Sequence, residues 1–392
     1  MNLGRTVLAQ LMDYLDADSF ERIVERHNNG RRQYRFSCRE QFLCMVFAQL
    51  TGRESLRDIE TCLRAFQGAL YHSGLRSRVS RSTLAHANEH RSWEMYRAVA
   101  LHLIARARVL YAQEKFLSEI DAAIYALDGT IIDLCLALCP WATAANHQNT
   151  TAGVKLHTQF SIQAHLPVFA RVSEANINDM YFLDDITLDP GAFYVLDRGF
   201  MDFTRLYKID QAGAYFVIRG KNTLRFVRVN SRPVDRRIGL IADQTIRLLV
   251  RGSVEGYPDC LRRIRYSDRE QQRSFVFLTN NFLLEPLTIC KLYRSRWQVE
   301  LFFKWVKQHL RIKTFYGTTR NAVYTQIWIA LATFVLVAII KKELKLEHSL
   351  YTILQILSLT LFEKVPLYQA LTQTQLADEQ LHDPNQLPLF TL

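Results

Sequence analysis

Two aspartates at the ends of apolar runs are the first residues that could do chemistry. Asp128 follows Ile-Tyr-Ala-Leu and precedes Gly-Thr, and Asp197 follows Phe-Tyr-Val-Leu and precedes Arg-Gly. A charged group at the end of an otherwise buried strand is costly unless it is paired or binds a metal ion. A turn or a helix cap explains either aspartate taken alone, so a functional role requires a partner.

A third carboxylate, Glu300, is the one acid among eight basic residues between positions 291 and 320. At about 100° per residue of helix, four polar side chains share one narrow stripe: Tyr293, Arg296, Glu300 and Lys307. Ordinary ion pairing with Arg296 or Lys304 is the alternative explanation of Glu300. The stripe predicts that one acid, two cations and a phenol face the same place.

Together the three carboxylates would form an oxygen-rich site. Hard divalent cations such as Mg²⁺ and Mn²⁺ prefer oxygen ligands. The seven cysteines include no C-x-x-C pair and are odd in number, which argues against a zinc site and against a disulfide framework. The sequence therefore favours magnesium or manganese as the metal.

The elements that must position these side chains change character near residue 121. Residues 1 to about 115 have helical periodicity, whereas strand-like runs at 124–135, 154–162, 168–172, 192–197 and 214–218 surround a helical segment at 201–209. This alternation predicts an α/β sheet. Residues 219–275 alternate like strands and carry 14 basic and 6 acidic residues, which predicts a basic β insertion. A long helix is expected from 286 to about 310.

Composition and charge narrow the class of partner. The chain has 392 residues with a net charge of +11 and 49% hydrophobic residues, as expected for a globular protein with a polyanionic partner, nucleic acid first and an acidic membrane second. The longest apolar run, 327–340, has 14 residues and is shorter than the about 20 that a membrane span requires. We expect a buried core helix there, no membrane association and, without a signal pattern, a cytoplasmic protein.

The N-terminal region has its own basic character. Residues 20–110 contain 16 Arg, no Lys and 8 acidic residues. The densest part, 73–84, has three arginines before and at the start of an expected helix, capped by Ser80 or Ser82: Arg76, Arg78 and Arg81. This pattern would suit a helix-turn-helix whose arginines contact DNA. The alternative is a solvated helical face with arginines paired to nearby glutamates.

Four motifs together resemble a known family. Tyr293, Arg296, Glu300 and Lys307 have the spacing Y-x2-R-x3-E-x6-K, which is similar to the signature of bacterial insertion-sequence DDE transposases, the family that includes insertion sequence four. Leu-Asp128-Gly-Thr and Leu-Asp197-Arg-Gly-Phe resemble its first two aspartate motifs, and Arg-Trp-Gln-Val-Glu300 resembles its third. The similarity runs from about 120 to 345, and the basic insertion lies where this family carries one.

The resemblance implies an RNase H-like catalytic domain in which Asp128, Asp197 and Glu300 hold two divalent ions, Mg²⁺ or Mn²⁺. It also implies phosphate contacts beside the ions, from Tyr293, Arg296, Lys307 and Arg198. A transposase of this kind nicks the transposon end with water and then uses the freed 3′-hydroxyl to attack another phosphate. Its partners would be double-stranded transposon ends and target DNA, with two subunits in the DNA complex, acting in the bacterial nucleoid.

The resulting prediction is an α/β protein with five segments. Residues 1–118 form an all-α DNA-binding domain, 119–220 and 275–345 form the two parts of an RNase H-like domain, 221–274 form the basic β insertion, and 346–392 form a helical region and tail. We expect a DNA transposase that binds terminal inverted repeats and performs metal-dependent cleavage and strand transfer. The alternatives are a catalytically inactive DNA-binding protein derived from such an enzyme, and an RNase H-like nuclease or resolvase.

Overall fold

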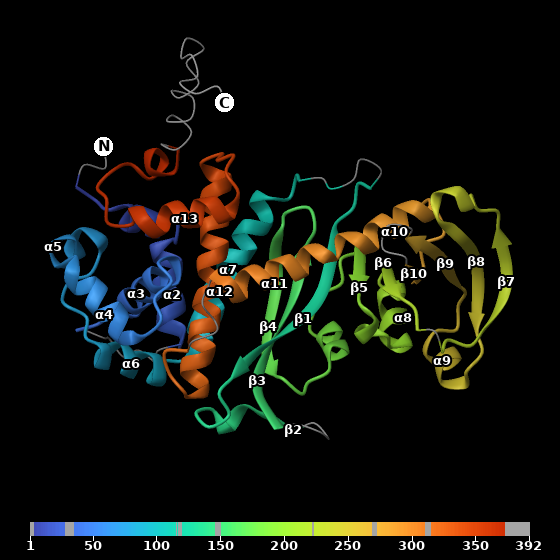
Figure 1. Ribbon diagram of the computed structural model, residues 1–392, viewed down its shortest axis with the longest axis horizontal. Helices are drawn as coiled ribbons and strands as arrows, with labels where there is room; N and C mark the ends of the chain where they lie inside the picture. The colour runs from blue at the N-terminus through green and yellow to red at the C-terminus, as the bar shows by residue number, and fades with distance from the viewer. Residues whose placement is uncertain are drawn as a thin grey trace, which may run out of the picture. The chain divides into compact units, whose positions relative to one another are not determined.

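The computed structural model describes residues 4–27, 35–114, 116, 120–145, 150–221, 223–268, 273–309 and 315–372 (Figure 1). The chain divides into two compact units, one made of residues 1–110 and 306–392 and the other of residues 111–305. The first unit is built from helices and the second around one large sheet. The predicted boundary at 118/119 borders positions that lie outside the described residues.

The described residues of the helical unit begin with seven α-helices and one 3-10 turn. They are α1 (Val7–Met12), α2 (Ala17–His27), α3 (Cys38–Leu50), α4 (Leu56–Ala65), α5 (Gln67–Leu70), η1 (Tyr71–Ser73), α6 (Arg81–His90) and α7 (Trp93–Leu110). Side-chain caps explain several of the starts: Ser37 and Glu40 form a capping box on α3, and Ser80 accepts a hydrogen bond from the N–H of Thr83 at the start of α6. The predicted Ser80 cap is therefore present.

The same unit is completed by α12 (Arg320–Glu343) and α13 (Leu350–Thr360). By length and composition α12 could cross a membrane, yet the whole of its most apolar window is buried inside the protein. It packs against α7, α3, α6 and α13. Residues 327–340 thus form a core helix, and their partners are the N-terminal helices. The sequence had instead placed residues 275–345 together in the second part of the catalytic domain, whereas the compact units divide them at residue 306.

The described residues of the second unit form ten strands. They are β1 (Ile124–Leu134), β2 (Thr143–Ala145), β3 (Thr150–Ser161), β4 (Leu166–Glu174), β5 (Phe193–Leu196), β6 (Tyr215–Arg219), β7 (Phe226–Arg232), β8 (Leu240–Leu248), β9 (Leu261–Asp268) and β10 (Arg273–Thr279). Their order is β2-β3-β1-β5-β6-β10-β9-β8-β7, and β4 pairs with β3. The mixed α/β architecture agrees with the predicted class and is consistent with an RNase H-like fold.

Short helices and turns connect these strands. They are η2 (Pro140–Ala142), η3 (Asp179–Asp184), η4 (Arg198–Phe200), α8 (Phe203–Gln211), η5 (Arg236–Ile238), α9 (Arg251–Gly256) and α10 (Pro286–Ser295), followed by α11 (Trp297–His309). Leu206 and Ile209 of α8 pack with Leu196 and Ile218 on one face of the sheet. On the other face, Tyr293 of α10 contacts Phe277 of β10, with ring centroids 4.7 Å apart. Figure 1 shows α10 and α11 running across the strands.

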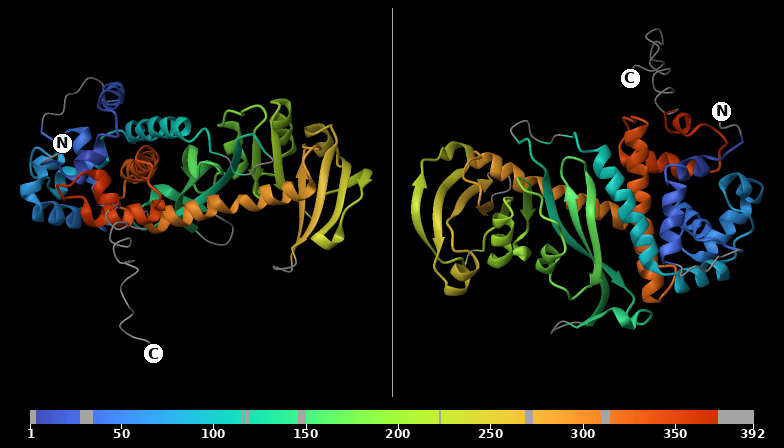
Figure 2. Two further views of the ribbon diagram at one scale, coloured as in Figure 1. Left: turned by 90° about the horizontal axis from the view of Figure 1, so that it is seen from above. Right: turned by 180° about the vertical axis from the view of Figure 1, so that it is seen from behind.

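The basic insertion extends the same sheet. Strands β7, β8 and β9 continue it beyond β10 by antiparallel pairing, as the two views of Figure 2 show. A buried ion pair, Arg262 to Asp243, joins β9 to β8, and both side chains are 3% exposed. Arg262 also donates to the carbonyl oxygens of Asn281 and Leu284, in the segment that leads into α10. The insertion is thereby tied to the start of the helix that carries Tyr293.

Candidate active site

The register between β1 and β5 places the two aspartates side by side. The strands are parallel, and Leu127 is paired with Leu196, so Asp128 and Asp197 are the next residues on neighbouring strands. Both leucines belong to the core on the α8 face. Because side chains alternate along a strand, Asp128 and Asp197 point to the opposite face, where α10 and α11 lie.

The predicted long helix is two helices joined by one tight turn at Arg296. The N–H of Arg296 donates to the carbonyl of Tyr293, and the N–H of Val299 donates to the carbonyl of Arg296. These are i to i−3 bonds, which tighten the helix locally. The polar stripe survives the turn, and its apolar neighbours Leu292 and Val299 are fully buried.

Hydrogen bonds connect the stripe to both aspartates. The Tyr293 hydroxyl donates to Oδ1 of Asp197 at 3.1 Å. Arg296 donates from Nη1 to Oδ2 of Asp128 at 2.7 Å and from Nη2 to Oε1 of Glu300. The structure therefore brings these five sequence-predicted residues together from two strand ends and one helix pair.

Burial perturbs the ionisation of the site. Burial raises the pKa of Asp128 to about 6, helped by repulsion from Glu300 and Asp197 and opposed by Arg296 and the Gly129 N–H. Burial also raises the pKa of Tyr293 to about 12, with a contribution from Asp197. Burial opposes the charge of Arg296, but attraction to Asp128 and the other anionic groups raises its pKa overall. The negative charge on the site is thus only partly offset by the protein.

Oxygen donors of the kind that Mg²⁺ or Mn²⁺ binds are present in this site. Among the residues that the structure describes, no three His, Cys, Asp or Glu side chains lie close enough together to hold a metal ion. Arg296 instead bridges Asp128 and Glu300. The donor chemistry and the partly offset charge of these carboxylates fit a divalent cation.

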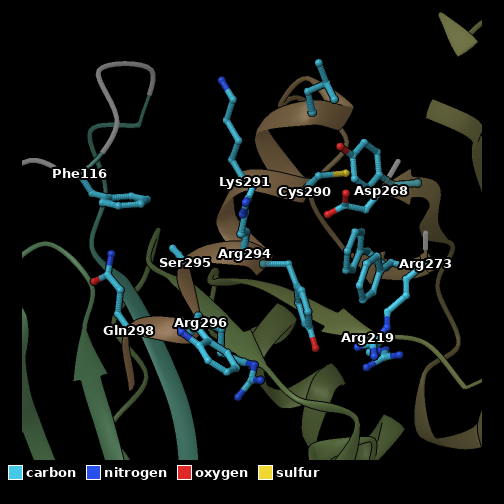
Figure 3. A pocket seen from close by; sticks show the side chains of 16 residues that line it. Phe116, Arg219, Asp268, Arg273, Cys290, Lys291, Arg294, Ser295, Arg296 and Gln298 are labelled. Atoms are coloured by element: carbon cyan, nitrogen blue, oxygen red, sulfur yellow. The ribbon is translucent and has the colours of Figure 1, made fainter. Parts of the chain in front are cut away.

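A cavity of about 1000 Å³ opens beside this network (Figure 3). Residues of β6, β9, β10, α10 and α11 are among those that line it. The lining includes one acid, Asp268, and five cations: Arg219, Arg273, Lys291, Arg294 and Arg296. Trp297, which directly follows Arg296, lines the same cavity and is 59% exposed. The sequence missed Arg219 and Arg273 as neighbours of the signature helix, although the net positive charge of their segment was visible.

Two further predicted phosphate ligands lie near these elements in the chain. Arg198 begins η4 directly after Asp197, and its buried Nε has no hydrogen-bond partner among the described residues; the same holds for Nε of Arg296. Lys307 is half-buried on α11, seven residues after Glu300, so the helix returns it to the same side after about two turns.

The predicted N-terminal DNA contacts partly pair with glutamates. Arg76 and Arg78 lie in the loop before α6 and are 69% and 54% exposed, and their guanidinium groups are each 3.7 Å from a glutamate, Glu40 and Glu60 respectively. Arg81 is the first residue of α6 and donates its backbone N–H to Glu60. Both the DNA-contact prediction and its ion-pair alternative thus retain support at these positions.

Comparison with known proteins identifies the family. Residues 120–336, more than half of the chain, match the family described as "Transposase DDE domain". The chain belongs to this transposase family. Residues 3–76 of the transposase match a separate domain family of unknown function (DUF4372).

Proteins with similar sequences are also named as transposases. The transposase is 30% identical over 247 residues to a Sinorhizobium fredii protein named as transposase y4zB, covering 62% of this chain and 68% of that one. It is 30% identical to a Geobacillus stearothermophilus protein named as the transposase of insertion sequence element IS5377, covering 54% of each chain. It is 21% identical to the transposase for insertion sequence element IS231E of Bacillus thuringiensis subsp. finitimus, over 81% of this chain and 76% of that one.

A solved structure of piggyBac transposase in a synaptic complex with hairpin DNA aligns with 97% of this chain and 83% of that one, with a TM-score of 0.48 and 11% identity. The family match and the named relatives support a DNA transposase of bacterial insertion-sequence type. The narrower assignment to the insertion-sequence-four group stays a prediction.

Proposed function

We propose that this transposase binds the terminal inverted repeats of its insertion sequence and catalyses cut-and-paste transposition of DNA. The observation that carries the proposal is the joining of Asp128, Asp197 and Glu300 through Arg296 and Tyr293 in a transposase DDE domain. A family match alone leaves open whether the chemical groups are in place. Contacts of Tyr293 and Arg296 with carboxylates at the ends of β1 and β5 and on α11 support the proposal beyond the family match.

Asp128, Asp197 and Glu300 are the residues that would hold the divalent ions, Mg²⁺ or Mn²⁺. Two such ions supply activation of the attacking oxygen and stabilisation of the leaving 3′ oxygen in phosphodiester chemistry. Tyr293 orients Asp197 through its hydroxyl, and Arg296 offsets the charge on Asp128 and Glu300.

The cationic side chains around the three carboxylates would bind the DNA phosphates. The Nε–H groups of Arg296 and Arg198, which have no hydrogen-bond partner in the part of the chain that the structure describes, would donate to phosphate oxygens. Lys307 would contact the DNA strand further along α11. The arginines that line the cavity extend this positive surface away from the acids. Such a surface attracts the DNA backbone and makes binding dependent on salt concentration.

The helical N-terminal region would recognise the ends of the element, with Arg76, Arg78 and Arg81 as DNA contacts. Two subunits would hold the two ends, and the protein would act in the cytoplasm at the bacterial nucleoid. Two subunits allow paired ends to be cut in one complex, which is the arrangement implied by the family resemblance.

Strand cleavage tests the proposal. Labelled DNA carrying the element's own terminal repeats is incubated with Mg²⁺, Mn²⁺ or EDTA and with wild type or Glu300→Ala. The matched control is Glu255→Gln, since Glu255 pairs with Arg251 on the exposed surface of α9. We expect metal-dependent nicking at the element boundary, absent in Glu300→Ala and retained in the control.

The outcomes separate the alternatives. Tight binding to the ends without cleavage in any metal would support an inactive DNA-binding protein and refute the enzyme. Cleavage of branched junctions without strand joining would support a nuclease or resolvase.

A further inference from the structure

A second charged cluster lies behind the aspartates, on the opposite face of the sheet. Its members are Asp179 at the start of η3 and two side chains of β3, Lys155 and His157. Lys155 Nζ and His157 Nδ1 are each 3.3 Å from Oδ1 of Asp179. Lys155 is 11% exposed and His157 2% exposed. Buried charged groups of this kind persist only when they compensate one another.

Other contacts hold each member of the cluster in place. Lys155 Nζ donates to the carbonyl of Ile177 at 2.8 Å, and His157 Nε2 lies 2.9 Å from Oγ of Ser173. The His157 ring also stacks on Phe182, with centroids 5.3 Å apart. Two fixed side chains of β3, the strand next to β1, therefore lie at ion-pair distance from the Asp179 carboxylate.

The Asp179 carboxylate also contacts the two chain segments that carry the aspartates. A Cβ on Gly129 would lie 2.5 Å from Oδ1 of Asp179 and 3.2 Å from Nδ1 of His157. A Cβ on Gly199 would lie 3.9 Å from Oδ2 of Asp179. Gly129 directly follows Asp128, and Gly199 is two residues after Asp197. One carboxylate thus packs against the backbone beside Asp128 and lies near the backbone that follows Asp197.

Glycine at position 129 is required by this packing. Gly129 pairs with His157 across the β1–β3 ladder, so both positions face the cluster, whereas Asp128 faces the site. A side chain at 129 would occupy the space that the Asp179 carboxylate fills. Because Gly129 has no side chain, the Asp179 carboxylate can pack directly behind Asp128.

We infer that Asp179, held by Lys155 and His157, is a positioning residue that sets the separation of Asp128 and Asp197 and thereby the affinity of the site for divalent cations. The inference rests on the proposed function, because it concerns the same site. The cluster acts from behind the sheet and does not touch the reacting groups. Its effect passes through the backbone at Gly129 and Gly199.

The test compares Asp179→Asn with wild type in the full chain. Asn keeps the size of the side chain and removes the charge that binds Lys155 and His157. Asp185→Asn is the matched control, because Asp185 caps the other end of η3 and pairs with Arg171 on β4 at the surface. Three quantities are measured: Mn²⁺ binding by calorimetry, the midpoint of thermal unfolding, and the Mn²⁺ concentration for half-maximal cleavage.

We expect Asp179→Asn to weaken Mn²⁺ binding about tenfold or more, as for other residues that orient metal ligands from behind. The half-maximal Mn²⁺ concentration should rise to match, while the rate at saturating Mn²⁺ changes much less. Asp185→Asn should bind Mn²⁺ as wild type does. A purely structural role would lower the unfolding midpoint without this change in metal affinity.

Gly129→Ala is the second variant, and it decides the question if Asp179→Asn does not fold. It leaves Asp179, Lys155 and His157 in place but puts a methyl group where the Asp179 carboxylate lies, so it should weaken Mn²⁺ binding in the same direction. Wild-type Mn²⁺ affinity in both folded variants would overturn the inference. So would a wild type that binds no Mn²⁺. A wild type that binds Mn²⁺ but fails to cut DNA would refute the proposed function alone.

Discussion

Replacing Asp128 with asparagine should stabilise the protein above pH 6 while removing its activity. The carboxyl is 19% exposed, and burial together with repulsion from Glu300 and Asp197 raises its pKa from 3.8 to about 6. The folded protein therefore favours the neutral carboxyl, and ionisation at neutral pH costs stability. Asparagine has the same shape and carries no charge.

The size of the effect follows from the shift in pKa. A rise of about 2 pH units corresponds to about 3 kcal/mol, since each unit is worth about 1.4 kcal/mol. Asparagine also weakens the contact with Arg296, so we expect a net gain of about 1–3 kcal/mol. For a unit of this size that is about 3–10 °C in the unfolding midpoint.

The raised pKa of Asp128 determines the direction in which the stability of the protein changes with pH. The folded-state pKa of this acid is raised, so its neutral form is favoured in the fold and the cost is absent below about pH 4. The cost appears as the pH rises from about 4 to 6 and is constant above that. The difference in unfolding midpoint between Asp128→Asn and wild type should therefore grow from about pH 4 to 6 and stay constant above that.

Thermal unfolding without metal at pH 4, 5, 6, 7 and 8 measures this gap. Asp133→Asn is the control, because Asp133 lies on the same strand and is exposed. Adding Mg²⁺ should raise the unfolding midpoint of wild type and leave that of Asp128→Asn unchanged, since a ligand stabilises only the form that binds it. A variant less stable than wild type at pH 8, or a gap independent of pH, would refute the reasoning.

Three further substitutions test other parts of the structure. Arg262→Met leaves the buried carboxylate of Asp243 with Arg232, 3.7 Å away, as its remaining ion partner and should cost about 3 kcal/mol in chemical denaturation, whereas adding Asp243→Leu should recover most of that loss. Tyr293→Phe removes the hydroxyl that donates to Asp197; stability should change by about 1 kcal/mol or less, while the cleavage rate at limiting Mn²⁺ falls and is partly restored at saturating Mn²⁺. Ser80→Ala removes the cap of α6 and should cost about 1 kcal/mol in thermal unfolding, and an unchanged midpoint would contradict the capping role.

The amino-acid sequence by itself determined the elements and the chemistry they could carry. Alternating apolar runs predicted β1, β3, β4, β5 and β6, and the apolar length of residues 327–340 predicted a core helix, which α12 is. The stripe of Tyr293, Arg296 and Glu300 followed from helical spacing alone, because residues three and four apart share a helix face. These are local properties of neighbouring residues.

Only the tertiary structure decided which distant residues meet. The parallel register of Leu127 with Leu196 places Asp128 beside Asp197, and the tight turn at Arg296 lets one guanidinium bind both Asp128 and Glu300. Helical periodicity could not distinguish an exposed Trp297 from a buried one, because that depends on what packs against the helix.

Local periodicity also did not predict the packing of η3 against the sheet or the packing partners of helices in the helical unit. Asp179 is the first residue of η3, and its closeness to Gly129 depends on how η3 folds against β1. Likewise, the burial of α12 was predictable but its partners α7 and α3 were not. Periodicity follows from the geometry of one element, whereas register and packing partners follow from the free energy of burying surfaces that lie far apart in the chain.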